Sequence, residues 1–334
     1  METPIPQPDT VDKLRFAADA ALAMLAGMQL DVFTPLQAGP KTAEEIAHAI
    51  GVRPARLRLL LYSLVAAELL TEQNGRFSNA PEANQFMVKG SPTYIGYRQP
   101  TFSAQMLDKL KTAESIRTGV PQAKHDFYNS PQDEVEAFLR RINVRAVQSA
   151  RALLERYDFT TTQTLVDVGC GCAGIALTMT KACPHMRATA IDLPLVTPIA
   201  RKVIEEEGMT DTVEVITADV LSGPLPGLYD VVILRNLLQV LSLSDARLAV
   251  NNIGAAIKPG GTIYIVGQIL DDCRTSPLEA VGFNLSFINH YDAGESYTER
   301  EHRGWLSDAG FVDIERVNFL LPDGEGVMTA RKPK

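Results

Sequence analysis

Leu165-Val-Asp-Val-Gly169-Cys-Gly171-Cys-Ala-Gly174 is the stretch that decides the fold, because it sets a Gly-x-Gly-x-x-Gly loop directly after an apolar strand. A predicted helix over residues 175–183 follows the loop. Glycines at these positions allow a tight turn and let a bound molecule approach the backbone closely. The stretch therefore predicts a strand, a loop and a helix that together grip a nucleoside cofactor.

Two acidic residues end the next two predicted strands. Asp192 lies 18 positions after Gly174, close to the ~20 expected for an acid that binds ribose hydroxyls. Asp219 ends the third strand, where an acid suits the exocyclic amine of adenine and the apolar Val220 suits its ring. Taken alone, Asp219 fits a solvated strand end equally well. The glycine pattern alone also fits nicotinamide and flavin dinucleotides.

The chain from residue 161 to its end alternates short apolar runs with helical stretches. The runs cover residues 165–168, 188–191, 213–216, 231–234 and 262–266. This alternation is typical of a parallel sheet wound with helices. We therefore predict an α/β, Rossmann-like domain over residues 161–334. A mostly helical linker over residues 106–160 precedes this domain. Dinucleotide enzymes, in contrast, often begin with the glycine loop.

Residues 1–105 have the pattern of a winged helix. Apolar residues recur at helical spacing over 11–36, and Thr42 with Glu45 forms a capping box for a short helix. Another helix begins at Pro54, and Asn74-Gly75 marks a hairpin between two short extended segments. The helix after Pro54 is too apolar for a recognition helix in a DNA groove. A dimerisation domain is the favoured interpretation, and a DNA-binding regulator is the rival.

Composition restricts the partners. The net charge is −8 and the basic residues are scattered, whereas a duplex-binding surface needs clustered positive charge. No apolar run reaches the ~18–20 residues of a membrane-spanning helix, and no signal peptide is recognisable. Four cysteines form no metal-ligand set. We expect a cytoplasmic protein with reduced thiols, without a bound metal, nucleic acid or membrane.

Four motifs in register resemble the small-molecule O-methyltransferases of the plant caffeate type and their bacterial relatives. They match the family's cofactor motifs, and they are Val166-Asp167-Val168-Gly169-Cys-Gly171, Asp192-Leu193-Pro194, Ala218-Asp219-Val220 and Lys258-Pro259-Gly260-Gly261. The resemblance covers nearly the whole chain. It implies a homodimeric transferase that uses S-adenosyl-L-methionine to methylate a small aromatic or apolar metabolite. The cofactor residues it implies are Asp167, Gly169, Gly171, Gly174, Asp192, Leu193, Asp219, Val220 and Arg235.

The chain departs from this family at the catalytic base. Gln239 occupies the position of the family's histidine, and an amide cannot take a proton near neutral pH. Gly267 and Ser296, with Glu295 adjacent, occupy the positions of the two acids that orient that histidine. Three explanations remain open. His290 serves as the base, as in a branch that methylates carbon in bacteriochlorophyll synthesis; or the acceptor needs no base; or methyl transfer has been lost, as in relatives that hydroxylate or steer cyclisations.

The acceptor pocket is expected between the linker helices and residues 280–300. The resemblance places its walls at Phe138, Ile142, Asn143, Phe287, His290 and Tyr291. The linker segment His125-Asp126-Phe127-Tyr128 is a weaker candidate. The spacing of the linker residues suits a buried helix face equally well, and a lone histidine is more often structural than catalytic. His48, His185 and His302 are expected in exposed helical positions and receive no role.

Overall fold

The computed structural model describes residues 7–127, 129–318, 321 and 324–334, and it divides into two compact units, Met1–Leu107 and Asp108–Lys334. The division falls within helix α5 (Gln99–Lys109). Each unit has its own core of buried apolar side chains. In the part of the chain that is described, no helix is long and apolar enough to cross a membrane.

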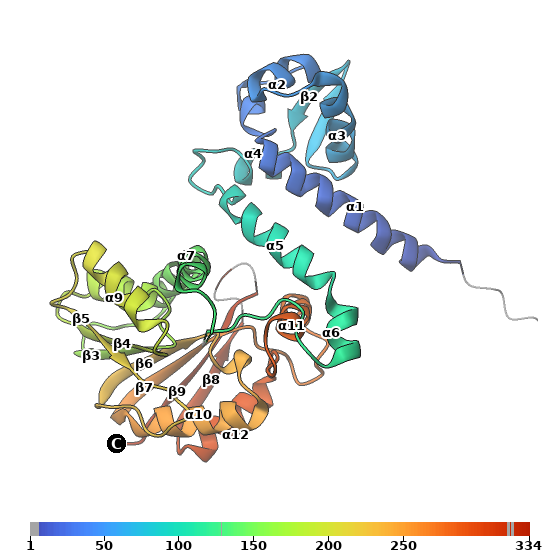
Figure 1. Ribbon diagram of the computed structural model, residues 1–334. Helices are drawn as coiled ribbons and strands as arrows, with labels where there is room; N and C mark the ends of the chain where they lie inside the picture. Colours follow the sequence, from blue (N-terminus) through green and yellow to red (C-terminus); the bar gives the residue numbers. More distant parts are fainter. Residues whose placement is uncertain (1–6, 128, 319–320, 322–323) are drawn as a thin grey trace, which may run out of the picture. The chain divides into compact units, whose positions relative to one another are not determined.

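The N-terminal unit has the predicted winged-helix order (Figure 1). Helices α1 (Asp9–Leu30), α2 (Ala43–Ile50) and α3 (Pro54–Ala66) precede strands β1 (Leu70–Gln73) and β2 (Arg76–Asn79), and α4 (Pro81–Phe86) follows. Thr42 and Glu45 form the predicted capping box. Asn74 and Gly75 both have positive φ, at 53° and 77°, as a tight turn between antiparallel strands requires. The predicted hairpin is confirmed.

Helix α1 ends earlier than its apolar spacing predicted. Asp31 adopts the left-handed conformation and caps the helix, and the segment Thr34–Ala38 is a short 3-10 helix. The predicted single helix over residues 11–36 is therefore wrong at its end. The break lies at Asp31, whose φ of 60° turns the chain, and the N–H of Val32 then donates to the carbonyl of Gly27 at 3.0 Å, a hydrogen bond typical of a helix C-terminus.

The C-terminal unit is built on a seven-stranded sheet of order β5-β4-β3-β6-β7-β9-β8 (Figure 1). The strands are β3 (Thr164–Val168), β4 (Arg187–Asp192), β5 (Val213–Thr217), β6 (Tyr229–Arg235), β7 (Ile257–Gly267), β8 (Val312–Val317) and β9 (Gly326–Arg331). The first five pair in parallel, and β9 pairs with β7 and β8 in the antiparallel sense. All five predicted runs are strands.

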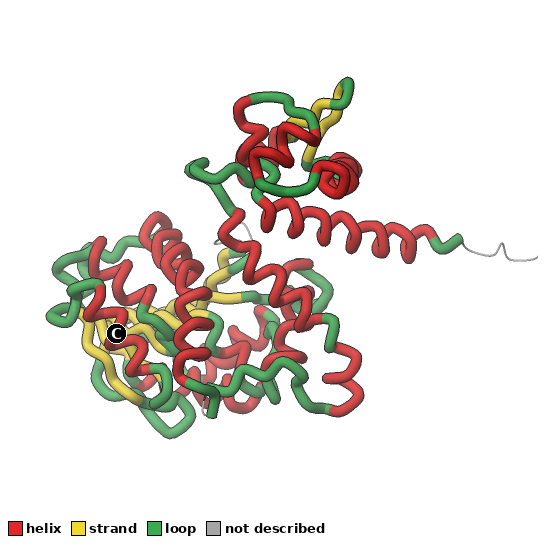
Figure 2. Tube along the Cα trace, turned by 45° about the horizontal axis from the view of Figure 1, so that its top comes forward, coloured by secondary structure: helices red, strands yellow, loops and turns green. Residues whose placement is uncertain are grey.

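Helices cover both faces of this sheet (Figures 1 and 2). Apolar residues of α7 (Gln132–Arg156), α8 (Gly174–Ala182) and α9 (Thr197–Glu206) pack in one core, and those of α10 (Leu243–Ala255) and α12 (Glu299–Asp308) pack in another. Helices α6 (Thr112–Thr118) and α11 (Leu278–His290) contact each other beside the sheet. This is the expected α/β architecture. Because these five strands are parallel, their carboxyl ends lie together along one edge of the sheet.

The position of His302 contradicts its prediction as exposed. It lies on α12 with no exposed surface, and its Nδ1 lies 2.8 Å from the carbonyl oxygen of Thr298. Its ring packs 5.1 Å from that of Trp305. A helix has an inner and an outer face, and the neighbouring aromatic residues place His302 on the inner one.

Candidate functional site

The glycine loop is tied to the end of β4 by backbone hydrogen bonds. The N–H groups of Gly169 and Cys170 both donate to the carbonyl of Ile191, at 2.9 and 3.1 Å. Gly169 and Gly171 have φ values of 70° and 54°, a region that glycine adopts more readily than other residues. A Cβ on Gly171 would meet nothing closer than a Leu139 side chain at 3.5 Å. The backbone of the loop is therefore open to a bound molecule.

Gly174 has a different role from the first two glycines. A Cβ at this position would overlap the side-chain amide of Asn143 on α7. The third glycine of such loops serves close packing of the helix, and here it lets α7 approach α8. The Oδ1 atom of Asn143 is buried and has no hydrogen-bond partner among the described residues. Asn143, predicted in the acceptor pocket, thus lies directly against the glycine loop.

Asp192 is held at the end of β4 by two backbone amides. Gly171 N–H donates to its Oδ2 and Leu193 N–H to its Oδ1, each at 2.8 Å. Burial raises the pKa of this carboxyl to about 6 despite these bonds. A carboxylate offers about four acceptor sites, so roughly two stay available. Asp192 therefore fits a ribose, whose hydroxyls would supply the missing donors.

Asp167 stabilises the helix start that follows the glycine loop. It is 2% exposed, and its Oδ2 accepts a hydrogen bond of 3.1 Å from Ala176 N–H in the first turn of α8. Burial and the nearby Asp192 raise the pKa of Asp167 to about 7, while the Ala176 N–H opposes this rise. An acid is favourable at a helix N-terminus. The contact fixes the start of α8 and hence the loop before it.

Asp219 and Val220 follow the adjacent strand, β5. The N–H of Ala218 donates to the backbone carbonyl of Asp192 at 3.1 Å, which joins the ends of the two strands. The Oδ1 atom of Asp219 accepts a hydrogen bond from Leu221 N–H at 2.9 Å, and Val220 is 8% exposed. The acid and the apolar residue thus stand at the same edge of the sheet as Asp192, where an adenine could extend from the ribose.

Arg235 is occupied by protein partners. Its Nη2 atom lies 2.7 Å from Glu325 Oε1, and its Nε donates to Ser149 Oγ at 2.9 Å. Ser149 Oγ in turn donates to the other oxygen of Glu325. The two side chains of the ion pair are 10% and 1% exposed. The residue that the resemblance placed beside the cofactor therefore joins β6, α7 and the start of β9.

The Lys258-Pro-Gly-Gly motif lies at the opposite edge of the sheet from the glycine loop. Lys258 is the second residue of β7, and its Nζ bonds Thr164 Oγ1 and Asp230 Oδ1, both at 2.9 Å. Asp230 also accepts from Thr164 N–H at the start of β3. Its description as a cofactor motif is corrected: it joins the amino ends of three strands.

Gln239 lies in a buried cluster of amide groups. It is 1% exposed, its Nε2 donates to the backbone carbonyl of Gln268 at 3.4 Å, and its Oε1 has no described partner. A Cβ on Gly267 would overlap this amide, so a glycine at this position provides the space for it. Glu295 instead pairs with Arg274 at 3.0 Å. Neither the amide of Gln239 nor Gly267 can accept a proton near neutral pH.

His290, at the end of α11, contacts a carboxylate of the linker. Its Nε2 lies 3.0 Å from Asp108 Oδ2. Its ring meets that of His125 edge to face, with centroids 4.3 Å apart. Burial lowers the pKa of both imidazoles, that of His125 to about 4, while Asp108 opposes the lowering in each. Both are therefore neutral at physiological pH. Asp108 is the contact that sequence reasoning missed, since it is 182 residues from His290.

A cavity of about 360 Å³ opens next to this pair. Phe138 was predicted in the acceptor pocket and lines the cavity, whereas Ile142, Phe287, His290 and Tyr291 are not on its wall. Tyr291 and Phe287 lie behind His125. The ring centroid of Tyr291 is 6.1 Å from that of His125 and 6.1 Å from that of Phe287. Tyr128 lies outside the described residues. The residues of the wall are Lys124, His125, Asp126, Phe127, Ser130, Glu134, Val135, Ala137, Phe138 and Arg141.

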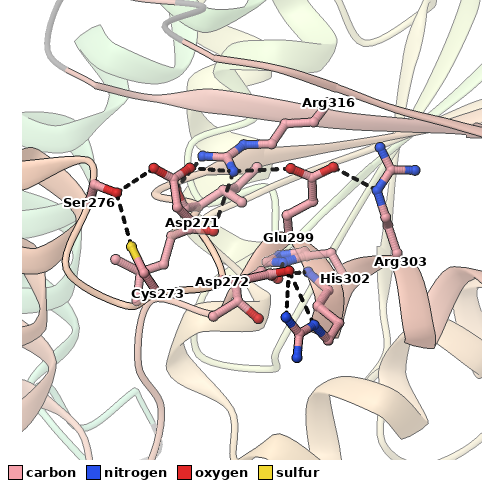
Figure 3. Close-up of polar contacts among 12 residues, drawn as sticks. Asp271, Asp272, Cys273, Ser276, Glu299, His302, Arg303 and Arg316 are labelled. Carbon is pink, nitrogen blue, oxygen red and sulfur yellow. Dashed lines mark hydrogen bonds and ion pairs between the residues drawn. The ribbon is translucent and has the colours of Figure 1, made fainter.

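A second polar cluster anchors the segment between β7 and α11 (Figure 3). Arg316 on β8 lies 2.8 Å from Asp271 and 3.2 Å from Glu299, and its Nη2 donates to the carbonyl of Ile269 at 2.9 Å. Glu299 also pairs with Arg303. The Arg316 side chain is 7% exposed. These bonds fix the path of the chain into α11, which carries His290.

Comparison with known protein families gives two matches. Residues 100–312 match the O-methyltransferase domain family, and residues 16–89 match the O-methyltransferase dimerisation domain. The first match alone spans more than half of the chain.

Individual proteins are similar over nearly the whole length. A 3-hydroxy-5-methyl-1-naphthoate 3-O-methyltransferase of Streptomyces sahachiroi is 28% identical over 92% of this chain and 91% of its own. A tetracenomycin polyketide synthesis 8-O-methyl transferase of Streptomyces glaucescens is 28% identical, with 98% and 97% covered. The solved apo structure of the S-adenosylmethionine-dependent methyltransferase SibL superposes with a TM-score of 0.81 at 26% identity, with 98% and 100% covered.

Proposed function

The chain belongs to the O-methyltransferase family and is an S-adenosylmethionine-dependent methyltransferase, and from this premise we propose that it methylates a hydroxyl of a small polycyclic aromatic acceptor. The observation that carries the proposal is the aromatic cavity of the linker. Phe138 lies on the wall of this cavity, and the next residue, Leu139, packs near Gly171 of the glycine loop. The cavity and the loop are therefore joined by neighbouring residues of α7.

Four residues at one edge of the sheet are proposed to hold the cofactor. Gly171 leaves space, Asp192 has acceptor sites for the ribose, and Asp219 with Val220 suits the adenine. When bound, S-adenosylmethionine supplies a methyl group on a positively charged sulfur. The residues of the chain bind and orient both reactants and exclude water. Alignment alone supplies up to ~7–11 kcal/mol in ideal cases.

The cavity suits an aromatic acceptor. Phe127 and Phe138 lie on its wall with ring centroids 6.0 Å apart, and the His125 ring lies 4.3 Å from Phe138. The Arg141 guanidinium lies over the Phe138 ring at 5.5 Å. Flat rings stack well on such walls. The name of one relative specifies a naphthoate and that of another specifies tetracenomycin polyketide synthesis. The two fused rings of the naphthoate support a fused-ring phenol as the acceptor.

Methyl transfer to a defined phenol tests this proposal. The enzyme is incubated with S-adenosylmethionine and either 3-hydroxy-5-methyl-1-naphthoate or the same naphthol without its carboxylate. We expect a product heavier by one methylene group and an equal amount of S-adenosylhomocysteine, measured by mass spectrometry. Tight binding of S-adenosylhomocysteine without methylation of any hydroxynaphthalene would reject the acceptor class and leave the cofactor assignment intact.

His290 is proposed to belong to the acceptor site, and its removal is expected to slow the reaction. The variant His290→Ala leaves Asp108 without its imidazole partner. It also removes the ring that packs against the ring of His125. We expect kcat to fall by about 100-fold while the affinity for S-adenosylhomocysteine, measured by calorimetry, stays unchanged. His185→Ala, an exposed residue in a turn, is the control. Full activity of His290→Ala would reject the role.

The homodimer is proposed to form through the N-terminal unit. Helix α1 carries exposed apolar side chains along its length, among them Leu14 at 66% and Leu22 at 58% exposed. Each leucine buried in an interface contributes about 1.5–3 kcal/mol. We therefore expect the double variant Leu14→Glu/Leu22→Glu to weaken dimerisation by more than about 100-fold, measured by light scattering over a range of concentrations. Leu248→Glu, on α10, is the matched control, and an unchanged dimer in the double variant would contradict this interface.

A further inference from the structure

We propose that His125 is the residue that contacts the acceptor and takes its proton, and that Asp108, acting through His290, is a positioning residue for it. This inference rests on the proposed function, because it needs a phenolic acceptor in the cavity of the linker. Neither Asp108 nor His125 lies where the family's histidine and acids would lie, since Gln239, Gly267 and Ser296 occupy those positions.

The placement of the two imidazoles distinguishes their roles. His125 is on the wall of the cavity, whereas His290 is not. His290 stands behind His125, with the rings at 79° and their centroids 4.3 Å apart. The ring of Phe138 contacts His125 as well, also at 4.3 Å. The His125 ring is therefore held between two aromatic neighbours and reaches the space where an acceptor would bind.

Backbone bonds fix the segment that carries His125. Ala123 N–H donates to the carbonyl of Asn289 at 2.9 Å, and His125 N–H donates to that of His290 at 3.0 Å. The buried side chain of Asn289 bonds Ser115 Oγ at 2.7 Å and Thr112 Oγ1 at 2.8 Å on helix α6. A group held in this way loses little freedom when it reacts.

Asp108 supplies the negative charge behind the pair. Its Oδ2 lies 3.0 Å from His290 Nε2, and its Oδ1 lies 3.7 Å from Lys111 Nζ. A carboxylate on one ring nitrogen fixes the tautomer and orientation of an imidazole. The negative charge of Asp108 also raises the pKa of His125, against the larger effect of burial, and so favours its protonated form. Asp108 thus favours the state of His125 that forms during the reaction.

The proposed step is balanced in atoms and charge. The acceptor hydroxyl oxygen forms the new bond to the methyl carbon while the bond from that carbon to sulfur breaks. The electron pair stays on the sulfur, which becomes a neutral thioether. The hydroxyl proton passes to a nitrogen of neutral His125. The positive charge of the sulfonium is thereby replaced by that of the imidazolium, and no oxidant, metal or further reactant is needed.

Kinetics of two conservative variants provide the first test, with 3-hydroxy-5-methyl-1-naphthoate as the probe. We expect His125→Asn to lower kcat by about 100-fold and Asp108→Asn by about tenfold, with KM changed less than threefold. Both variants should bind S-adenosylhomocysteine as the wild type does. His48→Gln, exposed on α2, is the control. Wild-type kcat in His125→Asn would overturn the inference.

Histidine titration by NMR provides a test that needs no acceptor. Asp108 raises the pKa of both imidazoles, so Asp108→Asn should move both midpoints to lower pH. The acid limb of kcat/KM should move in the same direction, because neutral His125 then persists to lower pH. If the titration midpoints of His125 and His290 are the same in Asp108→Asn as in the wild type, the role of Asp108 is overturned, even if no probe is methylated. The groups that face the two rings are Asp108, Lys109, Lys111, Arg141 and Tyr291, and the cavity wall adds Lys124, Asp126 and Glu134.

Discussion

Asp192→Asn is expected to weaken the binding of S-adenosylhomocysteine by about 100-fold, or about 2.8 kcal/mol. Both oxygens of Asp192 accept backbone N–H bonds at 2.8 Å. An asparagine would turn its NH₂ group toward one of these N–H donors and could not accept from both ribose hydroxyls. Calorimetry measures the effect, and Glu205→Gln on the exposed face of α9 is the matched control.

The pH dependence of binding gives the same prediction a second readout. The pKa of Asp192 is raised to about 6 by burial, and only its ionised form accepts from both hydroxyls. Wild-type affinity should therefore fall as the pH falls through about 6, because protons then compete with the ligand. The affinity of the Asp192→Asn variant should not fall in this way at low pH. A variant that binds within threefold of the wild type would contradict the role of Asp192.

Glu325→Gln is expected to lower the free energy of unfolding by about 3 kcal/mol. The change leaves the buried guanidinium of Arg235 without its ion-pair partner, since the side chains of the pair are 10% and 1% exposed. It also weakens the bond from Ser149 on α7. Urea unfolding followed by the fluorescence of Trp305, the single tryptophan, reports on the unit that contains the pair.

Two further variants separate charge burial from a general loss of packing. Asp313→Asn breaks the pair with Arg331, whose side chains are 51% and 59% exposed, and should cost less than about 1 kcal/mol. The double variant Arg235→Met/Glu325→Leu removes both buried charges and should recover most of the stability. A loss below about 1 kcal/mol in Glu325→Gln would show that the buried pair is not a stabilising element.

The parallel part of the sheet was predictable because its central strands, β3 and β6, are buried along most of their length. Such strands consist of nearly continuous apolar residues, and the runs at 165–168 and 231–234 have that composition. Strands β8 and β9 were not predicted. Strand β8, Val-Asp-Ile-Glu-Arg-Val, alternates polar and apolar residues at the edge of the sheet. Its pairing with β9 depends on tertiary contacts.

The cofactor half of the site was more predictable than the acceptor half. Gly171 and Asp192 are separated by one helix, and the order of strand, loop, helix and strand brings them together in any fold of this type. Asp108 and His290 have no such local rule. Asp108 lies at the end of α5, and its contact with His290 depends on how the following helix, α6, packs against α11. Lys258 shows the converse. Its motif was recognised, but the residue stands at the start of β7 and so lies at the amino ends of the strands, away from the glycine loop.

The sequence by itself determined the class of cofactor, the α/β fold and the winged helix, and Gln239 led to the prediction that the family's usual base is missing. These features depend on residue spacing within one or two adjacent elements, which local geometry converts directly into position. The tertiary structure decided that His125 is on the cavity wall, that Asp108 stands behind His290 and that Arg235 is paired with Glu325. Those contacts join residues distant in the chain, and only the packing of whole helices and strands brings them together.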